Sequence, residues 1–447
     1  MGTAMQRSKL FRMMVGAVML TTTASVSVAA EAPAAQSSSS DASGAGAIAS
    51  GTEITVKNWQ KYKRYMTDGM VTLFRGQYFF QMSDDVKIDV GPTLIRPLPK
   101  SYLDATDKYA SQVKIVELGN GGLSLSGYQG GKPFPDLEEP HKGWKVLANL
   151  WYRYFPHIIV DTYANACTQS SGGGSGNCGA DEVVYRQLSY NTDPGIPANT
   201  TGAEGKFYTE WVMTLEPEQE KYNATLTIAY ADLAKPADTY AFVPALRRYL
   251  PVAAAGRCAQ TGGRDATAED YRVGFAGNLT QLRVDYVGAK QILGLVDVDP
   301  AQGKYPEGFE EPLGWPRPEW GKWQLRDVDV ISITKLPDYD GAFCYGRRVI
   351  YVDKQFAGAL WEDLYDKDMK VWKFLGLFRK TLEVPGIGPV NESGSQVTVF
   401  WDVQSRHSTV FANPTVGRQI YVNEQAPKEY NDLARYTTPA GLNDILH

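Results

Sequence analysis

Histidine and cysteine are scarce in this chain, with four of each among 447 residues. None of the histidines, His141, His157, His407 and His447, is spaced with a cysteine or another histidine as zinc ligands are, and the haem-attachment sequence Cys-x-x-Cys-His is missing. The sequence therefore argues against a metal or haem protein, and we expect no metal and no cofactor.

Several catalytic motifs are missing as well. The chain lacks Gly-x-Ser-x-Gly, His-Glu-x-x-His and a phosphate-binding Gly-Lys-Ser/Thr, the short sequences that place a serine nucleophile, a zinc site or a nucleotide. His407, which follows a predicted strand, is the remaining candidate for a general base. We expect that the protein is not an enzyme, and we keep an extracytoplasmic hydrolase that uses His407 as an alternative.

A large excess of charge is also lacking. The chain has 45 Lys and Arg against 50 Asp and Glu, a net charge of −5, and its basic residues are scattered. Proteins that bind nucleic acid usually gather basic residues on one face. We therefore expect no nucleic-acid partner.

No apolar run approaches the roughly 20 residues that a membrane-spanning helix needs. The apolar run at residues 13–20 is preceded by Arg7, Lys9 and Arg12 and followed by small residues that end at Ala30. This order of basic, apolar and small segments is typical of a Sec-type signal peptide. We expect residues 1–30 to be removed and the mature protein to be soluble in the periplasm.

The even number of cysteines favours disulfides in an exported chain. Cys167 and Cys178 bracket a loop with the sequence Ser-Gly-Gly-Gly-Ser-Gly, which has no means of folding alone. We predict a Cys167–Cys178 disulfide. The sequence leaves open whether Cys258 and Cys344 pair.

The composition changes after the leader. Residues 31–51 are mostly Ala, Ser and Gly and are predicted to be a disordered linker. The rest of the chain, residues 52–447, is predicted to form a single large domain with an N-terminal extension. Its 26 Tyr and 10 Trp, together with 43 Gly and 25 Pro in the whole chain, are typical of many short strands joined by turns.

Periodicity indicates a few helices and many strands. Apolar residues at three- and four-residue spacing predict a helix over residues 142–154, and residues 101–117 are expected to form a helix followed by a strand. Alternation with period two predicts strands at 225–230, 282–286 and 397–403 and a three-stranded meander over residues 345–353, 359–366 and 370–379. The fold class is therefore mainly β (α+β), with a large curved antiparallel sheet and covering helices.

Four segments of this chain stand out, namely Val90-Gly91-Pro92-Thr93, residues 127–135, residues 244–248 and the meander of residues 345–379. In these segments the chain resembles a family of uncharacterised exported proteins of Gram-negative bacteria. That family is described as having a LolA-like fold, akin to the periplasmic carriers LolA and LolB that move lipoproteins to the outer membrane. The resemblance implies an incomplete antiparallel barrel closed by helices around an apolar cavity.

The resemblance implies a carrier or chaperone that binds a lipid or another hydrophobic molecule and shuttles it between membranes. It also implies partners, an exporter of the resistance–nodulation–division type and an outer-membrane protein. A non-catalytic adaptor that docks such partners is the alternative. We predict that the cavity is lined by Leu226, Ile228, Tyr230, Val399 and Trp401.

Arg247 and Arg248 lie between apolar residues in the segment 244–248. Two guanidinium groups in such a setting can hold an anionic head group through paired hydrogen bonds. We therefore predict that they belong to the ligand-binding residues, with ion pairs to acidic neighbours as the alternative.

Overall fold

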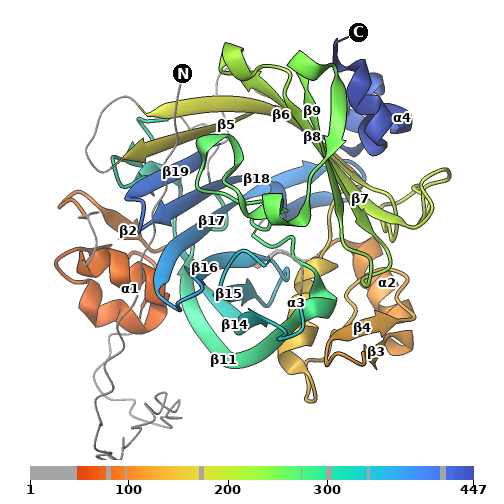
Figure 1. Cartoon of the computed structure of the whole chain (residues 1–447). Coiled ribbons are helices and arrows are strands. Elements are labelled where there is room, and N and C mark those ends of the chain that lie inside the picture. Colours follow the sequence, from red (N-terminus) through yellow and green to blue (C-terminus); the bar gives the residue numbers. More distant parts are fainter. Residues whose placement is uncertain are drawn as a thin grey trace, which may run out of the picture. The chain divides into compact units, whose positions relative to one another are not determined.

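Antiparallel strand pairing dominates the computed structural model (Figure 1). The structure describes residues 48–446 apart from residues 77–81, 96–97, 171–175, 273, 299–304, 340–342 and 413–418. All described residues belong to one compact unit that begins at Gly46. The predicted signal peptide, and the predicted linker up to residue 47, lie outside them.

The main sheet of the described chain has 14 strands. Its first half runs, in spatial order, through β10 (Arg248–Pro251), β9 (Asp238–Val243), β8 (Ala224–Tyr230), β7 (Lys206–Glu216), β6 (Asn177–Gln187) and β5 (Ile158–Ser170). Its second half continues with β19 (His407–Ala412), β18 (Gly388–Asp402), β17 (Val371–Val384), β16 (Ala359–Tyr365), β15 (Arg347–Asp353), β14 (Gln324–Lys335) and β11 (Leu282–Gly294). The short β20 (Ile420–Val422) also pairs with β5.

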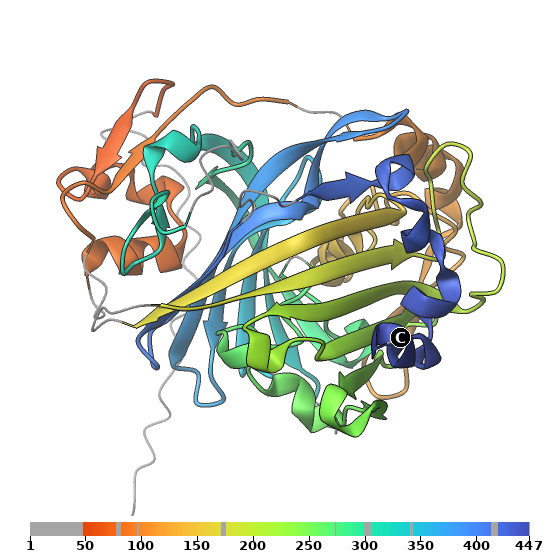
Figure 2. The same cartoon turned by 90° about the horizontal axis from the view of Figure 1, so that it is seen from above.

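Pairing between neighbours in the sequence builds most of the sheet, and the long-range pairing of β19 with β5 joins its two halves. The sheet curves strongly and stays open between β10 and β11 (Figures 1 and 2). This confirms the predicted fold class, a mainly β protein with a large curved antiparallel sheet. The meander of β15, β16 and β17 confirms the three strands predicted there, with β17 ending five residues later than predicted.

Short elements surround the sheet. The helices are α1 (Asp68–Arg75), α2 (Lys100–Tyr109), α3 (Lys142–Trp151) and α4 (Leu433–Thr437), and the remaining strands form the pairs β1 (Glu53–Thr55) with β2 (Lys87–Asp89), β3 (Lys114–Glu117) with β4 (Leu123–Ser126), and β12 (Phe309–Glu310) with β13 (Trp315–Pro316). In the described part of the chain, no helix combines the length and the apolar composition needed to cross a bilayer.

Helix α3 confirms the predicted aromatic helix and ends three residues earlier than predicted. Trp144, Leu147 and Trp151 share its buried side and pack in the core inside the curved sheet. Gly143 allows the close approach to β11, because a Cβ atom there would lie 2.7 Å from the backbone nitrogen of Tyr286. The helix therefore packs on the concave side of the sheet beside β14 and β11 (Figure 1).

Both faces of the sheet are covered. The concave face holds the largest core cluster, which includes α3, and the outer face carries two further clusters. On the second half of the sheet, α1 and β13 pack outside against residues such as Trp361 and Trp401. On the first half, Tyr436 of α4 and Leu442 pack outside against Trp211. Because core clusters lie on both faces of the sheet, some of its strands are buried on both sides.

Candidate functional site

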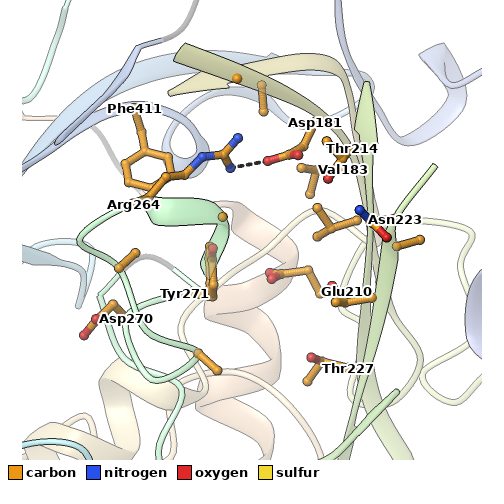
Figure 3. A pocket seen from close by; sticks show the side chains of 18 of the residues that line it. Asp181, Val183, Glu210, Thr214, Asn223, Thr227, Arg264, Asp270, Tyr271 and Phe411 are labelled. Atoms are coloured by element: carbon orange, nitrogen blue, oxygen red, sulfur yellow. Dashed lines mark hydrogen bonds and ion pairs between the residues drawn. The ribbon is translucent and has the colours of Figure 1, made fainter. Parts of the chain in front are cut away.

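A cavity of about 670 Å³ lies inside the first half of the sheet. One wall is the concave face of β6 to β9. The opposite wall is formed by the described residues of the segment 252–276, which we call the covering segment (Figure 3). Side chains of β17, β18 and β19, among them Leu377 and Phe400, complete the lining. The volume falls within the range of roughly 300–1,000 Å³ that is typical of small-molecule sites.

The sheet wall consists of rows of side chains that cross the strands. One row runs from Val183 through Val212 and Thr225 to Ala241, and the next row runs from Tyr185 through Glu210 and Thr227 to Thr239. Because successive residues of a strand point to opposite faces, each strand contributes every second residue to this wall. These two rows consist mostly of small or β-branched side chains, with one carboxylate, that of Glu210, among them.

Buried polar contacts hold the covering segment against the meander. The Arg348 guanidinium forms an ion pair with Asp270 and donates to the carbonyl oxygen of Gly274 at 2.6 Å, and Tyr345 Oη also donates to Asp270. A Cβ atom on Gly274 would lie 2.2 Å from Glu362 Oε1, so only glycine fits this approach. These contacts fix the wall that faces the sheet.

Two disulfides lie at the same site. Cys258 of the covering segment is bonded to Cys344, which precedes β15, and Cys167 is bonded to Cys178 across β5 and β6. The Cys167–Cys178 disulfide confirms the predicted bridge. The Cys258–Cys344 disulfide shows that the other two cysteines pair as well, which the sequence left open. Cys178 also lines the cavity.

The cavity has an aromatic end. Phe155, Tyr185 and Tyr208 line it and are buried, with the Tyr185 ring stacked 5.0 Å from Phe155 and 5.5 Å from Tyr208. The Arg272 guanidinium lies 4.5 Å from the centre of the Tyr208 ring and donates to the carbonyl oxygen of Trp151 at 2.7 Å. This arginine is held by rings and a carbonyl group rather than by a carboxylate.

The opposite end of the cavity is polar. Asp181 of β6 and Arg264 of the covering segment form an ion pair there, beside the Phe411 ring (Figure 3). Asn177 and Gln219 also line this end and are exposed to solvent. An elongated molecule with an apolar part and a polar part would therefore meet a matching gradient along the cavity.

Glu210 lies between the two ends and points from β7 toward the covering segment (Figure 3). Its side chain is partly accessible, from the cavity that it lines. Burial raises the pKa of its carboxyl group to about 7, although Arg272 acts in the opposite direction. Glu210 has no hydrogen-bond or ion-pair partner among the residues that the structure describes.

The structure places Leu226, Ile228 and Tyr230 away from this cavity. Leu226 and Ile228 are buried in the outer cluster beneath α4, and Tyr230 packs against the same cluster. The cavity is lined instead by their strand neighbours, among them Thr225 and Thr227. The predicted inner face of β8 is thus corrected: the apolar face is close-packed core because the C-terminal segment covers it.

The same correction applies to β18. Val399 and Trp401 belong to the other outer cluster, where the Trp401 ring stacks 5.2 Å from Trp361. Thr398 and Phe400 of this strand line the cavity. In both strands the alternation predicts two faces, but the more apolar face packs outward.

Arg247 and Arg248 lie at the turn between β9 and β10, at one edge of the sheet. Both are exposed, and neither lines the cavity. No described residue forms an ion pair or a hydrogen bond with their side chains. The structure therefore does not bring them together with the other predicted ligand-binding residues.

His407 begins β19, and its Nδ1 atom lies 3.6 Å from Asp265 Oδ1. Asp265 also accepts a hydrogen bond from Thr409 Oγ1 at 2.7 Å, so this carboxylate ties β19 to the covering segment. His407 is not a lining residue of the cavity. Within the described chain, no three His, Cys, Asp or Glu side chains are grouped as metal ligands.

Glu210 and the covering segment lie outside the site residues predicted from the sequence. A signal for Glu210 is present, because it is the one charged residue within Phe207–Val212 of a strand that otherwise carries aromatic and apolar side chains. The covering segment gives no such signal. It forms short 3-10 turns without a helical or a strand-like period, so its position depends on tertiary contacts.

The solved structures that are similar to this chain include the following two. A DUF1329 family protein from Desulfovibrio piger is 12% identical, with a TM-score of 0.44 over 66% of this chain and 98% of that chain. A LolA superfamily protein from Nitrosomonas europaea is 11% identical, with a TM-score of 0.38 over 67% of this chain and 98% of that chain. No curated protein matches the sequence.

A family model matches residues 53–443, which is nearly the whole of the described chain. Its description is "Protein of unknown function (DUF1329)". The match confirms the predicted resemblance to an uncharacterised family. This chain therefore belongs to the DUF1329 family.

Proposed function

We propose that this protein is a periplasmic carrier that holds an amphipathic lipid or a similar hydrophobic molecule in the cavity between β6 to β9 and the covering segment. The observation that carries this proposal is the cavity itself, with a volume of about 670 Å³. Its lining combines rings and small apolar side chains with a few polar groups, as ligand sites do. The two disulfides support an oxidising compartment such as the periplasm.

The energetics support an apolar ligand. Each methylene group removed from water contributes about 0.8 kcal/mol, so a twelve-carbon chain would gain about 9 kcal/mol before the costs of ordering it. Its binding needs no specific motif. The exporter and the outer-membrane protein implied by the family resemblance are part of the proposal as the donor and the acceptor of this cargo.

Native mass spectrometry of the protein after gentle purification tests the proposal. We expect one bound amphipathic molecule per chain, released by organic solvent. Val212→Trp places a large ring in the middle of the cavity and should remove the bound molecule. Val287→Trp is the matched control, because Val287 is 62% exposed on β11 and lies outside the cavity.

Two results would contradict the carrier. One is a wild-type protein that carries no molecule and binds no added amphiphile. The other is a Val212→Trp variant that binds as the wild type does. The adaptor would then become the better account of the fold.

A further inference from the structure

The polar groups next to Glu210 in the sheet wall form hydrogen bonds with residues other than Glu210. Its partners across the strands are Tyr185 on β6 and Thr227 on β8. The Tyr185 hydroxyl donates to Gln187 Oε1 at 3.0 Å, and the Thr227 hydroxyl lies 3.4 Å from the Thr239 hydroxyl in a hydrogen bond of their own. Neither neighbour turns its polar group to the Glu210 carboxylate.

The three arginines that line the cavity also form their hydrogen bonds and ion pairs with other groups. Arg264 is paired with Asp181, and Arg257 donates to Thr239 Oγ1 at 2.9 Å and to the carbonyl oxygen of Ala276 at 3.3 Å. Arg272 donates to a carbonyl group among aromatic rings. The lining contains these three arginines and six acidic side chains, one of which, Asp270, is paired with Arg348 from outside the lining. Acidic side chains therefore remain in excess, and no described cation forms a hydrogen bond or an ion pair with Glu210.

We propose that Glu210 holds a cationic group, a protonated amine, of the amphipathic ligand, while the apolar part of that ligand occupies the aromatic end of the cavity. This inference rests on the carrier function and specifies its ligand class. A carboxylate inside a protein is costly without a partner, and a charge-assisted hydrogen bond from an ammonium group supplies one.

The same charges act against an anionic ligand. A fatty acid that enters the cavity would bring its carboxylate toward Glu210 and the acidic lining. Two carboxylates at close range repel each other unless one of them takes up a proton. The site should therefore distinguish amphiphiles by the charge of the head group when their chains are equal.

The protonation state of Glu210 should make ligand binding depend on pH, which gives a second test of the inference. The titratable groups that face it are Tyr185 on β6, Tyr208 on β7, and Tyr271 and Arg272 on the covering segment. Tyr185 and Tyr208 stay neutral near pH 7 because burial raises the pKa of both hydroxyl groups. With a carboxyl pKa of about 7, Glu210 ionises between pH 6 and 8, and binding of an ammonium group should release a proton.

Calorimetric titration with three twelve-carbon probes, dodecylammonium, dodecanol and dodecanoate, tests the inference below their micelle concentrations. At pH 8 we expect the wild type to bind dodecylammonium about tenfold or more tightly than dodecanol, and dodecanoate more weakly than either. Dodecylammonium should also bind about tenfold more tightly at pH 8 than at pH 6, because the ionised fraction of Glu210 rises to that extent.

Glu210→Gln keeps the shape of the side chain and removes its charge. It should abolish the preference for dodecylammonium and the pH dependence, while the affinity for dodecanol stays the same. Glu218→Gln is the matched control, because Glu218 is an exposed acid outside the cavity. Circular dichroism of both variants checks that the fold is retained.

The outcomes separate this inference from the proposed function. If the three probes bind equally to the wild type, if dodecanoate binds best, or if Glu210→Gln keeps the preference, the cationic ligand is excluded and the carrier stands. If no probe binds the wild type, the carrier proposal itself fails. If Glu210→Gln loses the preference for dodecylammonium and the control variant keeps it, the result supports both the cationic ligand and the carrier.

Discussion

Neighbouring residues of β8 have different surroundings. Leu226 is fully buried in the outer cluster, whereas Thr225 lines the cavity and forms no hydrogen bond through its side chain with any described residue. The two side chains point to opposite faces of one strand. Close packing and an open cavity should therefore respond differently to the same truncation.

Leu226→Ala should lower the free energy of unfolding by about 3 kcal/mol, because it removes buried carbon atoms and leaves a void in a packed cluster. Thr225→Ala should cost about 1 kcal/mol or less, since the cavity already provides free space and only strand propensity changes. Denaturant-induced unfolding of both variants measures the difference. Equal costs would show that the cavity wall is as tightly packed as the outer cluster.

The sequence predicts the alternation at these positions but not which face meets the cavity. Apolar residues at Leu226 and Ile228 suit an apolar cavity and a packed core equally well, because both remove the side chain from water. The choice depends on α4, which lies more than 200 residues away and covers the outer face. The local sequence of β8 therefore does not determine which of its faces meets the cavity.

At the scale of elements, predictions from the sequence succeed where the contacts are local. The meander of β15 to β17 and the helix α3 depend on short turns and on one apolar side, both of which the sequence contains. The covering segment is different. Residues 252–276 depend on Arg348 and on the Cys258–Cys344 disulfide for their position, and both partners lie far along the chain.

The two disulfides should differ in their effect on stability. Cys258 and Cys344 are separated by 86 residues, and Cys167 and Cys178 by 11. In the chain-entropy model, closing the longer loop stabilises the protein by about 2 kcal/mol more. Replacing Cys258 and Cys344 together by serine should therefore lower the free energy of unfolding more than the same change at Cys167 and Cys178.

Denaturation of the two double variants under identical conditions measures this difference. The Cys258→Ser/Cys344→Ser variant should also bind the cavity ligand more weakly, because Cys258 belongs to the wall opposite the sheet. An equal or smaller loss of stability in this variant would mean that the buried contacts of Arg348 alone fix the covering segment.

At the scale of the whole molecule, the long-range pairing of β19 with β5 joins two halves that are each built from neighbours in the sequence. The join brings Phe400 and Phe411 of one half beside the wall formed by the other half. The cavity therefore exists only in the assembled sheet. No periodicity in the sequence predicts this pairing, so the sequence alone does not reveal that a cavity forms between the two halves.

Assembly also buries acidic side chains throughout the molecule. Burial raises the pKa of the carboxyl groups of Glu210, Glu269 and Asp363 to about 7, well above their ordinary values near 4. Glu269 packs beside Arg348 and accepts a hydrogen bond from the backbone nitrogen of Cys344 at 3.0 Å. Asp363 lies under α1, where it accepts a hydrogen bond from Trp361 Nε1 at 2.9 Å.

These three groups should make the protein less stable as the pH rises from 5 to 7. Between the unfolded and the folded pKa values, the folded state keeps protons that the unfolded state has released, so the free energy of unfolding falls with increasing pH. Each such proton contributes a slope of at most about 1.4 kcal/mol per pH unit. Their contribution to stability is full below pH 4 and is lost as the pH passes 7.

Glu210→Gln isolates one of these protons in the protein without ligand. Glutamine does not titrate, so the variant should lose part of the slope, up to about 1 kcal/mol per pH unit, and should gain stability relative to the wild type as the pH rises from 5 to 7. Denaturant-induced unfolding at several pH values in this range measures the slope, with Glu218→Gln as the exposed control. Parallel pH profiles for the wild type and Glu210→Gln would show that Glu210 stays ionised in the empty cavity, and the proton release expected on ammonium binding would then be absent.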